Sequence, residues 1–380
     1  MHDIVVIGAG PAGLSLALAL RRIGRECLLV DARAPGAARR DPRVLALSYG
    51  SRQILERLGV WGRFPATPIE TIHVSQQGGF GRTVIRAADQ GVPALGYVAD
   101  AADLAGALET AAEDARVERR YGTRVENIAA AKADAILSTV GDQGAATLAA
   151  RLVAHAEGAA SAARGIVGRD YGQQAVICTA KIAQPAPGTA WERFTPAGPL
   201  ALLPRGEVHA VVFTAATREA ERLAALEDAP FLEALQRQFG ERLRFLSAGP
   251  RAAFPLVLRV RTDPTGERSV FLGNAAQTLH PVAGQGFNLA LRDVWSLAEL
   301  LRQHEGADPG AAGLLRRYAA GRRLDRGGAV GFTDGLIRLF ANDNPLLRLA
   351  RGGGLALLDA VPPARDFVAR RMMFGARALP

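Results

Sequence analysis

The chain has 380 residues, of which 49% are hydrophobic and 22% are charged, and its formal net charge is +9 at pH 7. This composition is typical of a globular enzyme with one large core or two domains, and no apolar run is long enough to span a bilayer. The arginines are scattered until the C-terminus and no nucleic-acid-binding motif is present, so we expect no nucleic-acid partner. Cys27 and Cys178 lie far apart beside apolar runs, which predicts buried thiols in a reducing cytosol, with neither a disulfide nor a metal site.

The first predicted element is a short apolar strand over residues 4–7, which runs into a glycine-rich turn and then a helix. Gly8, Gly10 and Gly13 form the pattern G-x-G-x-x-G, which allows a tight turn, close approach to a pyrophosphate and close packing of helix on strand. The next apolar strand ends at Asp31, which either accepts a hydrogen bond from a ribose hydroxyl or is simply a solvated carboxylate. The pattern predicts a bound dinucleotide, although these residues alone do not separate FAD from NAD.

The middle of the chain alternates between two kinds of predicted structure. Residues 66–95 and 172–260 are rich in strand patterns, and the second stretch also contains a predicted helix over residues 218–239. The stretch between them has α/β character, with a helix near residues 100–113 and strands near residues 116–121, 125–131 and 146–154. The strand-rich segments therefore interrupt the α/β segments, which predicts a discontinuous domain organisation.

A second glycine-rich motif occupies residues 273–293, with the sequence GNAAQTLHPVAGQGFNLALRD. A strand leads into a turn of small residues, and an amphipathic helix is predicted to begin near Phe287. Gly284 and Gly286 have no Cβ atom, and a helix start offers unpaired N–H groups and the positive end of the helix dipole. Such a turn suits an electron-rich oxygen or a developing negative charge, whereas a glycine-rich connection in any α/β fold is the plainer interpretation.

The C-terminal part of the chain is predicted to be helical over residues 293–301, 314–326 and 332–340. Residues 344–380 then hold six arginines and two aspartates among many apolar side chains. This pattern is typical of a packed pair of helices with solvated arginines, and it also occurs in segments that lie on an anionic membrane surface or on a partner.

These motifs together resemble the single-component flavoprotein aromatic hydroxylases. The resemblance rests on the N-terminal fingerprint, on DPRVLALS at residues 41–48, and on GNAA, HPVAGQGFNL and RD within residues 273–293. The resemblance covers nearly the whole chain. In detail, the sequence is similar to the ubiquinone-biosynthesis hydroxylases of the 2-polyprenyl-6-methoxyphenol hydroxylase type. The resemblance favours FAD over NAD and implies an α/β fold with a Rossmann-like FAD-binding domain, an interleaved substrate domain built on a mixed β-sheet, and C-terminal helices.

The resemblance also implies how the chain is divided. The FAD-binding domain would be built from residues 1–65, 96–171 and 261–330, and the substrate domain from residues 66–95 and 172–260. Residues 331–380 would form a C-terminal helical segment.

The resemblance assigns roles to individual residues. Pro281 and Gly286 would position the flavin ring for catalysis, and Arg43 would touch the cofactor, although an arginine at a helix start can also form a local salt bridge. The residues expected at the cofactor are Gly8, Gly10, Ala12, Gly13, Asp31, Arg43, Val125, Glu157, Arg164, Gly273, Asn274, Pro281, Gly284, Gln285, Gly286, Phe287 and Asn288.

The sequence departs from the family pattern at two places. Glu157 stands where the family has aspartate. In the family, this loop helps to hold FAD and guides NADPH. The alternative interpretation is a solvent-facing loop at the end of a strand. Ala101 and Ala102 replace a polar side chain that usually lies near the pyrophosphate. His280 is interpreted as a structural histidine bonded to backbone beside Pro281, so no acid–base residue is assigned.

The reaction implied by the resemblance is the hydroxylation of a polyprenylated phenol in ubiquinone biosynthesis. NADPH or NADH would reduce FAD, and molecular oxygen would be the co-substrate. The hydroxylation would proceed through a flavin C4a-hydroperoxide. Two alternatives stay open: a hydroxylase of another aromatic metabolite, and a non-catalytic flavoprotein scaffold of a biosynthetic complex. We expect a cytoplasmic protein, and a peripheral location at the inner membrane face stays open. The expected ligand is a hydrophobic polyprenylated phenol, and a ubiquinone-biosynthesis complex, the membrane or a second copy of the chain are candidate partners.

Overall fold

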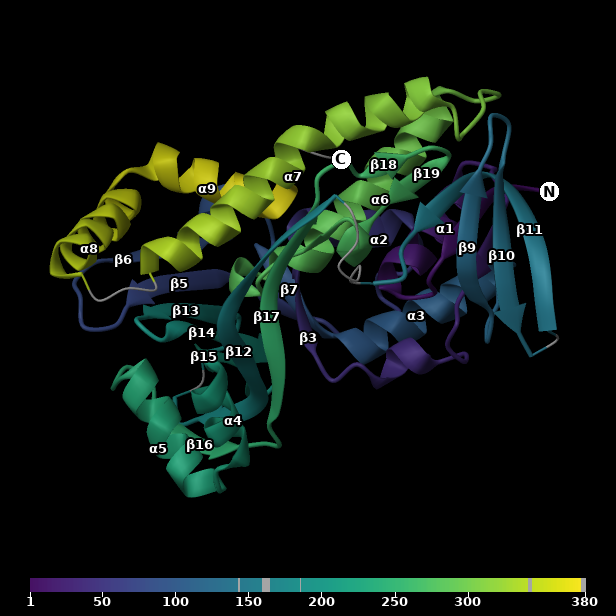
Figure 1. Cartoon of the computed structure of the whole chain (residues 1–380). Helices are drawn as coiled ribbons and strands as arrows, with labels where there is room; N and C mark the ends of the chain where they lie inside the picture. The colour runs from purple at the N-terminus through teal and green to yellow at the C-terminus, as the bar shows by residue number, and fades with distance from the viewer. Residues whose placement is uncertain (143, 159–164, 185, 341–343, 377–380) are drawn as a thin grey trace.

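The described residues form three β-sheets with α-helices packed around them, as the computed structural model in Figure 1 shows. The structure describes residues 1–142, 144–158, 165–184, 186–340 and 344–376. An eight-stranded sheet with its helices lies on the right of the view and a nine-stranded sheet lies on the left. The long helix α7 (Ala312–Phe340) runs above both parts.

The other helices are α1 (Pro11–Arg22), α2 (Tyr49–Arg57), α3 (Ala101–Asp114), α4 (Thr217–Ala225), α5 (Asp228–Phe239), α6 (Gln285–Gln303), α8 (Pro345–Ala360) and α9 (Pro362–Phe374). Strands of the first half are β1 (His2–Ile7), β2 (Cys27–Val30), β3 (Val44–Ser48), β4 (Thr67–Ile69), β5 (Thr71–Gln76), β6 (Arg82–Arg86), β7 (Gly96–Asp100), β8 (Glu118–Arg120), β9 (Arg124–Ala130), β10 (Ala135–Gly141) and β11 (Gly144–His155). Strands of the second half are β12 (Ile166–Ile182), β13 (Thr189–Thr195), β14 (Gly198–Arg205), β15 (Val208–Ala216), β16 (Phe245–Ala248), β17 (Ala252–Arg261), β18 (Thr265–Gly266), β19 (Ser269–Phe271) and β20 (Gln277–Thr278).

The eight-stranded sheet has a parallel centre, in the order β18-β19-β11-β1-β2-β8. β1 is a continuous apolar run whose Ile4, Val5 and Val6 are fully buried, as expected for a strand that is covered on both faces. Helices α1, α3 and α6 pack on the face that carries Ile4 and Val6. The antiparallel strands β9 and β10 contribute Ile128 and Leu137 to the apolar cluster around Val5. This arrangement confirms the predicted α/β class with a Rossmann-like half.

The nine-stranded sheet has the order β20-β17-β12-β15-β14-β13-β5-β6, with β16 paired to β12. Helices α4 and α5 cover one face, where Phe231 and Leu235 pack among buried side chains of β12, β14 and β15. The other face is turned toward the first sheet and forms one wall of the cavity described below. The short sheet β3-β7-β4 lies between the two, with β4 and β7 against β14 and β3 against α6.

Several predicted elements have different bounds in the structure, and one strand was not predicted. The helix predicted over residues 218–239 is divided into α4 and α5, because Pro230 has no N–H to donate and is tolerated only in the first turn of a new helix. The helices predicted over residues 314–326 and 332–340 form the single helix α7, so the boundary expected at residue 330 falls inside a continuous element. β10 was not predicted, and it joins β9 and β11 as an antiparallel neighbour.

The C-terminal helices pack on the sheet edge at β6. The Thr83 hydroxyl donates to the Leu355 carbonyl over 2.7 Å, and the Val84 N–H donates to the Asp359 carboxylate over 2.9 Å. This docking matches the packed helix pair considered from the sequence, although Arg351 is buried rather than solvated. No helix within the described ranges is long and apolar enough to cross a membrane.

Candidate active site

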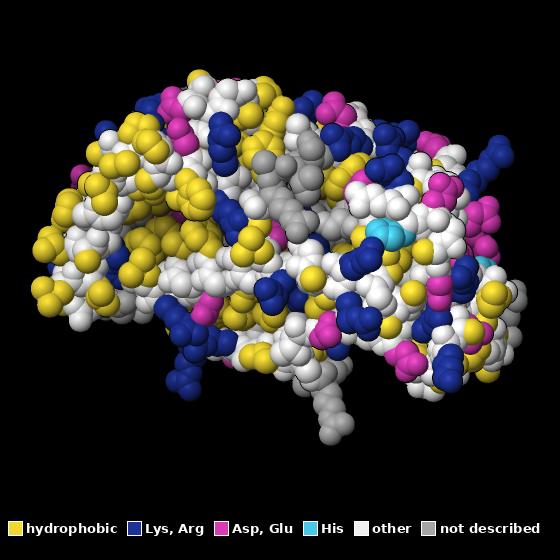
Figure 2. Space-filling view, turned by 90° about the horizontal axis from the view of Figure 1, so that it is seen from above, with side chains coloured by type: hydrophobic (Ala, Val, Ile, Leu, Met, Phe, Trp, Pro, Cys, Tyr) yellow, Lys and Arg dark blue, Asp and Glu magenta, His cyan; other side chains and the backbone are white. Residues whose placement is uncertain are grey.

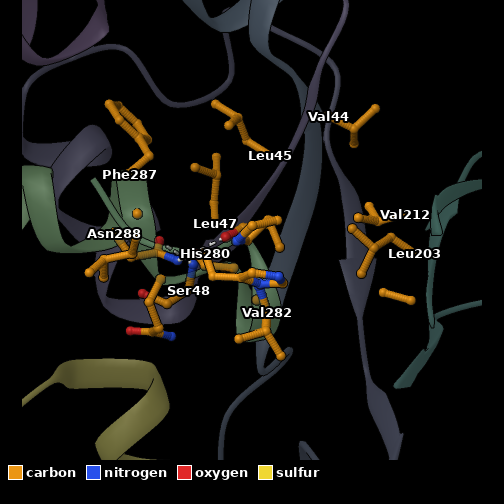
Figure 3. Close-up of a pocket in the computed structure, with 18 of the residues that line it drawn as sticks. Val44, Leu45, Leu47, Ser48, Leu203, Val212, His280, Val282, Phe287 and Asn288 are labelled. Atoms are coloured by element: carbon orange, nitrogen blue, oxygen red, sulfur yellow. Dashed lines mark hydrogen bonds between the residues drawn. The ribbon is translucent and has the colours of Figure 1, made fainter. Parts of the chain in front are cut away.

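A cavity of about 830 Å³ lies where the carboxyl ends of β1 and β11 face the open side of the nine-stranded sheet. Its walls come from the turns after β1, β11 and β19, from β3, from the nine-stranded sheet, and from helices α6 to α9. Figure 3 shows the close approach of these segments, with Phe287 and Asn288 on one side, Leu203 and Val212 on the other, and Leu45 and Leu47 of β3 between them. Clefts at the carboxyl ends of parallel strands are the usual ligand sites of open α/β sheets, and known small-molecule sites measure about 300–1,000 Å³.

The turn between β1 and α1 has the geometry that its glycines predict. Gly8 has φ of +103°, and a Cβ atom there would lie 2.6 Å from the Ala156 carbonyl oxygen. A Cβ atom at Gly13 would lie 1.8 Å from the Gly8 carbonyl oxygen, so only glycine lets α1 begin this close to the strand. At Gly10 the nearest atom to a Cβ would be the Arg33 guanidinium at 3.9 Å, because that backbone faces the cavity. Two glycines therefore shape the turn and the third leaves its backbone open to a ligand.

Asp31 is held by protein groups in this structure. The Ala9 N–H donates to its Oδ2 over 2.6 Å, and the Arg33 N–H and Nε donate to its Oδ1 over 2.7 and 3.0 Å. Burial opposes ionisation of this carboxyl, but the hydrogen bonds from Arg33 and Ala9 outweigh that effect and lower its pKa. Arg33, which the sequence did not single out, stands at the cavity wall in place of Asp31.

The start of α6 forms the opposite end of the same wall. Gly284 has φ of +61°, and a Cβ atom there would lie 2.9 Å from the Ala46 Cβ, so glycine is required both by conformation and by contact with β3. A Cβ atom at Gly286 would meet no atom within 4 Å, and this residue lines the cavity. The helix begins at Gln285, two residues before the predicted start.

The Asn288 side chain ties α6 to β3 and α2. Its Oδ1 accepts from the Ser48 N–H over 2.8 Å and from the Ser51 hydroxyl over 2.7 Å. Its Nδ2 donates to the Ala46 carbonyl over 2.8 Å and to the Gly284 carbonyl over 2.7 Å. All of its amide hydrogen-bonding groups are thus engaged within the protein, so any contact of Asn288 with a cofactor would be made by its backbone.

Arg43 reaches the cavity from the segment before β3. Its guanidinium donates to the Asp41 carboxylate over 2.8 and 2.5 Å, which is the local salt bridge considered from the sequence, and both residues line the cavity. The hydrogen bond to Asp41 raises the pKa of Arg43, which is partly exposed. Glu157 also lines the cavity, and its carboxylate lies 3.1 Å from Nδ1 of His155.

The other sequence-predicted residues divide into four groups by their location. Residues that line the same cavity are Ala12, Gly273, Asn274, Pro281, Gln285 and Phe287. Gly8, Gly13 and Asp31 lie behind the wall, and Val125 lies on β9 in the apolar cluster under the sheet. Arg164 lies outside the described residues.

His280 is almost completely buried, with 1% of its surface exposed, and it lines the cavity beside Pro281. The Val282 N–H donates to its Nδ1 over 3.1 Å, which agrees with the backbone contact predicted for this histidine. Burial lowers the pKa of His280 to about 4, so the ring is neutral and its proton is on Nε2. Nε2 is buried and has no hydrogen-bond partner in the part of the chain that the structure describes.

The wall formed by the nine-stranded sheet was not predicted residue by residue. Val212, Ala201, Glu192, Val74 and Thr83 lie side by side across five strands, and all of them line the cavity. The alternating pattern of these strands was visible in the sequence, but which of the two faces meets the cavity depends on the packing of α4 and α5 on the other face.

The wall residues fit a flavin dinucleotide. Gly10 and Gly286 present bare backbone to the cavity, and the first turns of α1 and α6 begin at its wall. Helix starts and arginines favour phosphate oxygens and electron-rich carbonyl oxygens, and Arg33, Arg40 and Arg43 line this end of the cavity.

Comparison with known proteins agrees with this fit. The model of the FAD binding domain family matches residues 1–330. Ubiquinone hydroxylase UbiL of Rhodospirillum rubrum is 32% identical over 398 residues, which cover 98% of this chain and 89% of that protein. The 3-demethoxyubiquinol 3-hydroxylase of Escherichia coli is 28% identical over 93% of each chain. The crystal structure of p-nitrophenol 4-monooxygenase PnpA from Pseudomonas putida has the same fold, with a TM-score of 0.76 over 99% of each chain at 18% identity.

The fold and the family match define an FAD-binding enzyme of the monooxygenase class. Within that class, the chain belongs to the family of FAD-dependent hydroxylases that includes the ubiquinone hydroxylases.

Proposed function

We propose that this enzyme hydroxylates the ring of a polyprenylated phenol in ubiquinone biosynthesis, with NADPH or NADH as reductant and molecular oxygen as co-substrate. The observation that carries the proposal is the single cavity that joins two unlike walls. One wall is glycine-rich and basic, and the other is an apolar sheet surface. A site of this kind holds a charged cofactor at one end and a hydrophobic ring at the other.

The residues of the glycine-rich wall would hold and orient FAD. The bare backbone at Gly10 would meet the pyrophosphate, and Arg43 would contact the cofactor from the edge of β3. Pro281 and Gly286 would fix the position of the flavin ring, and the N–H groups at the start of α6 would stabilise negative charge on it. When bound, FAD would supply the redox chemistry, and the flavin C4a-hydroperoxide expected from the sequence stays a prediction.

The apolar wall and the C-terminal helices would receive the substrate. Phe332 and Leu336 of α7, Leu355 of α8 and Met372 of α9 line the cavity on the side away from the glycine-rich turns. Apolar walls exclude water from the reacting ring and offer a path for a long prenyl chain.

The test is hydroxylation of a short-chain 2-polyprenylphenol by the purified, FAD-loaded protein under ¹⁸O₂. We expect NADPH- or NADH-dependent formation of a product that carries one ¹⁸O atom. Retention of FAD without any oxygen transfer would favour the non-catalytic scaffold instead. If the purified enzyme hydroxylates simple phenols and a deletion strain keeps normal ubiquinone without accumulating a prenylphenol, the hydroxylase of another aromatic metabolite would be the better assignment.

A contact with the membrane is a second part of the proposal. The hollow lined by hydrophobic side chains in Figure 2 lies over the region of α8 and α9, on the left of the molecule. Leu346 is 77% exposed, Leu349 60%, Leu357 64% and Phe367 70%, so both helices present apolar side chains to solvent. Exposed apolar clusters of this kind commonly mark interaction surfaces, and other side chains of the same two helices line the cavity.

A second cavity beside this surface adds positive charge. It measures about 790 Å³ and is lined by four arginines together with exposed apolar side chains, and by no carboxylate among the described residues. The arginines are Arg82, Arg193, Arg242 and Arg348. The combination of positive charge and exposed leucine suits an anionic lipid surface.

Sedimentation with phosphatidylglycerol vesicles tests this contact, with phosphatidylcholine vesicles as comparison. We expect the double variant Leu346→Gln, Leu349→Gln to bind the anionic vesicles roughly tenfold more weakly, because two apolar side chains no longer enter the bilayer. Leu246→Gln is the matched control, since Leu246 is 54% exposed on β16 of the nine-stranded sheet, away from α8 and α9. Equal binding by the double variant and the control would contradict the membrane contact.

A further inference from the structure

Glu192 is a carboxylate in an apolar wall. It lies on β13, where Ala190 and Phe194 share its face of the strand and both are buried. In the neighbouring strands its partners are Ala201 of β14 and Val74 of β5, and both line the same cavity. No neighbour in the sheet therefore offers it a positive charge on this face.

One oxygen of the Glu192 carboxylate lacks a partner within the described part of the protein. Its Oε1 is buried and has no hydrogen-bond partner among the described residues, although the residue as a whole is partly open to the cavity. A buried carboxylate oxygen without a partner is costly, and a native protein that keeps one commonly does so for a catalytic role or for a bound water or ion. Burial raises the pKa of Glu192 to about 7.

The other ionisable side chains of the cavity lie in two regions. Arg33, Arg40, Asp41, Arg43 and Glu157 lie at the glycine-rich wall. The facing elements around Glu192 are β14, β5, β6, the β20–α6 turn and helices α7 to α9, and their cavity-lining residues include one further titratable group, His280.

We infer that Glu192 binds the hydroxyl group of the phenol substrate and accepts its proton, which makes it the catalytic base that the sequence did not reveal. This inference rests on the function proposed above. The phenolic O–H bond breaks, the proton moves to the Glu192 carboxylate, and the electron pair stays on the phenolic oxygen. The electron density of the ring rises at the positions that accept oxygen, and the proton returns to the phenolic oxygen of the product.

His280 is a second polar residue that lines the same cavity. The neutral His280 ring carries its proton on Nε2, which is buried and has no partner among the described residues. Because the pKa of His280 is lowered to about 4, a titration near pH 7 in this part of the cavity belongs to Glu192.

The first experiment measures binding by calorimetry on the FAD-loaded protein. The probes are 2-(3-methylbut-2-enyl)phenol and its O-methyl ether, which cannot donate a hydrogen bond. We expect the wild-type protein to prefer the phenol, and Glu192→Leu to bind the phenol at least about tenfold more weakly while keeping its affinity for the ether. Glu207→Leu, which removes an exposed carboxylate in the β14–β15 turn, is the matched control and should keep the preference.

The second experiment uses Glu192→Gln, which keeps an acceptor oxygen but cannot take the proton. We expect a KM within a few-fold of wild type, a kcat about 100-fold lower, and loss of the decline in wild-type activity below pH 7. A purely structural role for Glu192 would not separate kcat from KM in this way.

The outcomes distinguish this inference from the proposed function. An unchanged phenol preference in Glu192→Leu, or full activity in Glu192→Gln, overturns the role of Glu192 while leaving the hydroxylase proposal intact. Wild-type protein that holds no FAD, or that transfers no oxygen, overturns the proposed function itself.

Discussion

The two walls of the cavity differ in how the fold secures them. The glycine-rich wall is fixed by close backbone contacts and by buried charges behind it, whereas the sheet wall is an apolar surface with an unsatisfied carboxylate. Behind the first wall, Arg322 Nε donates to Asp293 over 2.8 Å, and Arg292 Nε donates to Asp325 over 2.8 Å. The glycine-rich wall is therefore built for a fixed position, and a ligand of the sheet wall would owe its specificity to few polar atoms.

The largest effect should come from breaking the ion network that anchors α6 to α7. Arg322→Met leaves Asp293 and Asp325 buried without their shared partner, and we expect the free energy of unfolding to fall by about 3–5 kcal/mol. Chemical denaturation followed by circular dichroism measures this change. Arg323→Met, which removes the exposed neighbour on the same helix, should change stability by less than about 0.5 kcal/mol. Similar losses in both variants would mean that the network does not anchor the glycine-rich wall.

Gly286→Val tests the cofactor end directly. A Cβ atom at this position would meet no protein atom within 4 Å, so the valine side chain would stand in the space assigned to the flavin ring. We expect FAD affinity to fall at least about 100-fold with little loss of stability, because the clash is with the ligand alone. The absorbance of retained flavin after gel filtration measures the effect.

The matched control for that variant is Gly313→Val. Gly313 is the second residue of α7, as Gly286 is of α6, and its Cβ position is also free of atoms within 4 Å. Normal flavin content in Gly286→Val would show that the ring lies elsewhere.

The sheet wall should respond to pH through Glu192. Burial raises the pKa of this carboxyl from 4.5 to about 7. The contribution of the protonated carboxyl to the free energy of unfolding is therefore complete below pH 4.5 and is lost as the pH rises through 7. We expect the stability difference between wild type and Glu192→Gln to shift by up to about 3 kcal/mol against wild type between pH 4 and pH 8. Denaturation midpoints across this range measure the shift, and a constant difference would contradict the burial of an unpaired carboxyl.

The smallest effect should follow Glu157→Asp. Glu157 is about half exposed, and its contact is the ring of His155, so restoring the shorter carboxylate of the family should change FAD affinity by less than about threefold. The KM for NADPH should fall if this loop guides the reductant. A large loss of FAD affinity would show that the longer side chain has its own role at the cavity.

The parts of the site that were predictable are those set by local sequence. Gly8, Gly10 and Gly13 specify a turn whose geometry is nearly independent of the rest of the chain, and the structure gives each glycine a distinct contact. The role of Asn288 was less visible, because its partners Ser48 and Ser51 lie about 240 residues away. Glu192 could not be identified from the sequence, since an isolated carboxylate in an alternating strand normally faces solvent.

The proposed function requires that FAD and a phenol bind at the two unlike walls of one cavity. Its most direct test is the flavin absorbance spectrum of the purified protein during titration with 2-(3-methylbut-2-enyl)phenol. We predict one FAD per chain and a saturable change in the flavin bands, because the phenol and the flavin ring would occupy adjoining parts of the same space. A protein that retains no flavin, or a flavin spectrum that does not respond to a bound phenol, would contradict this account.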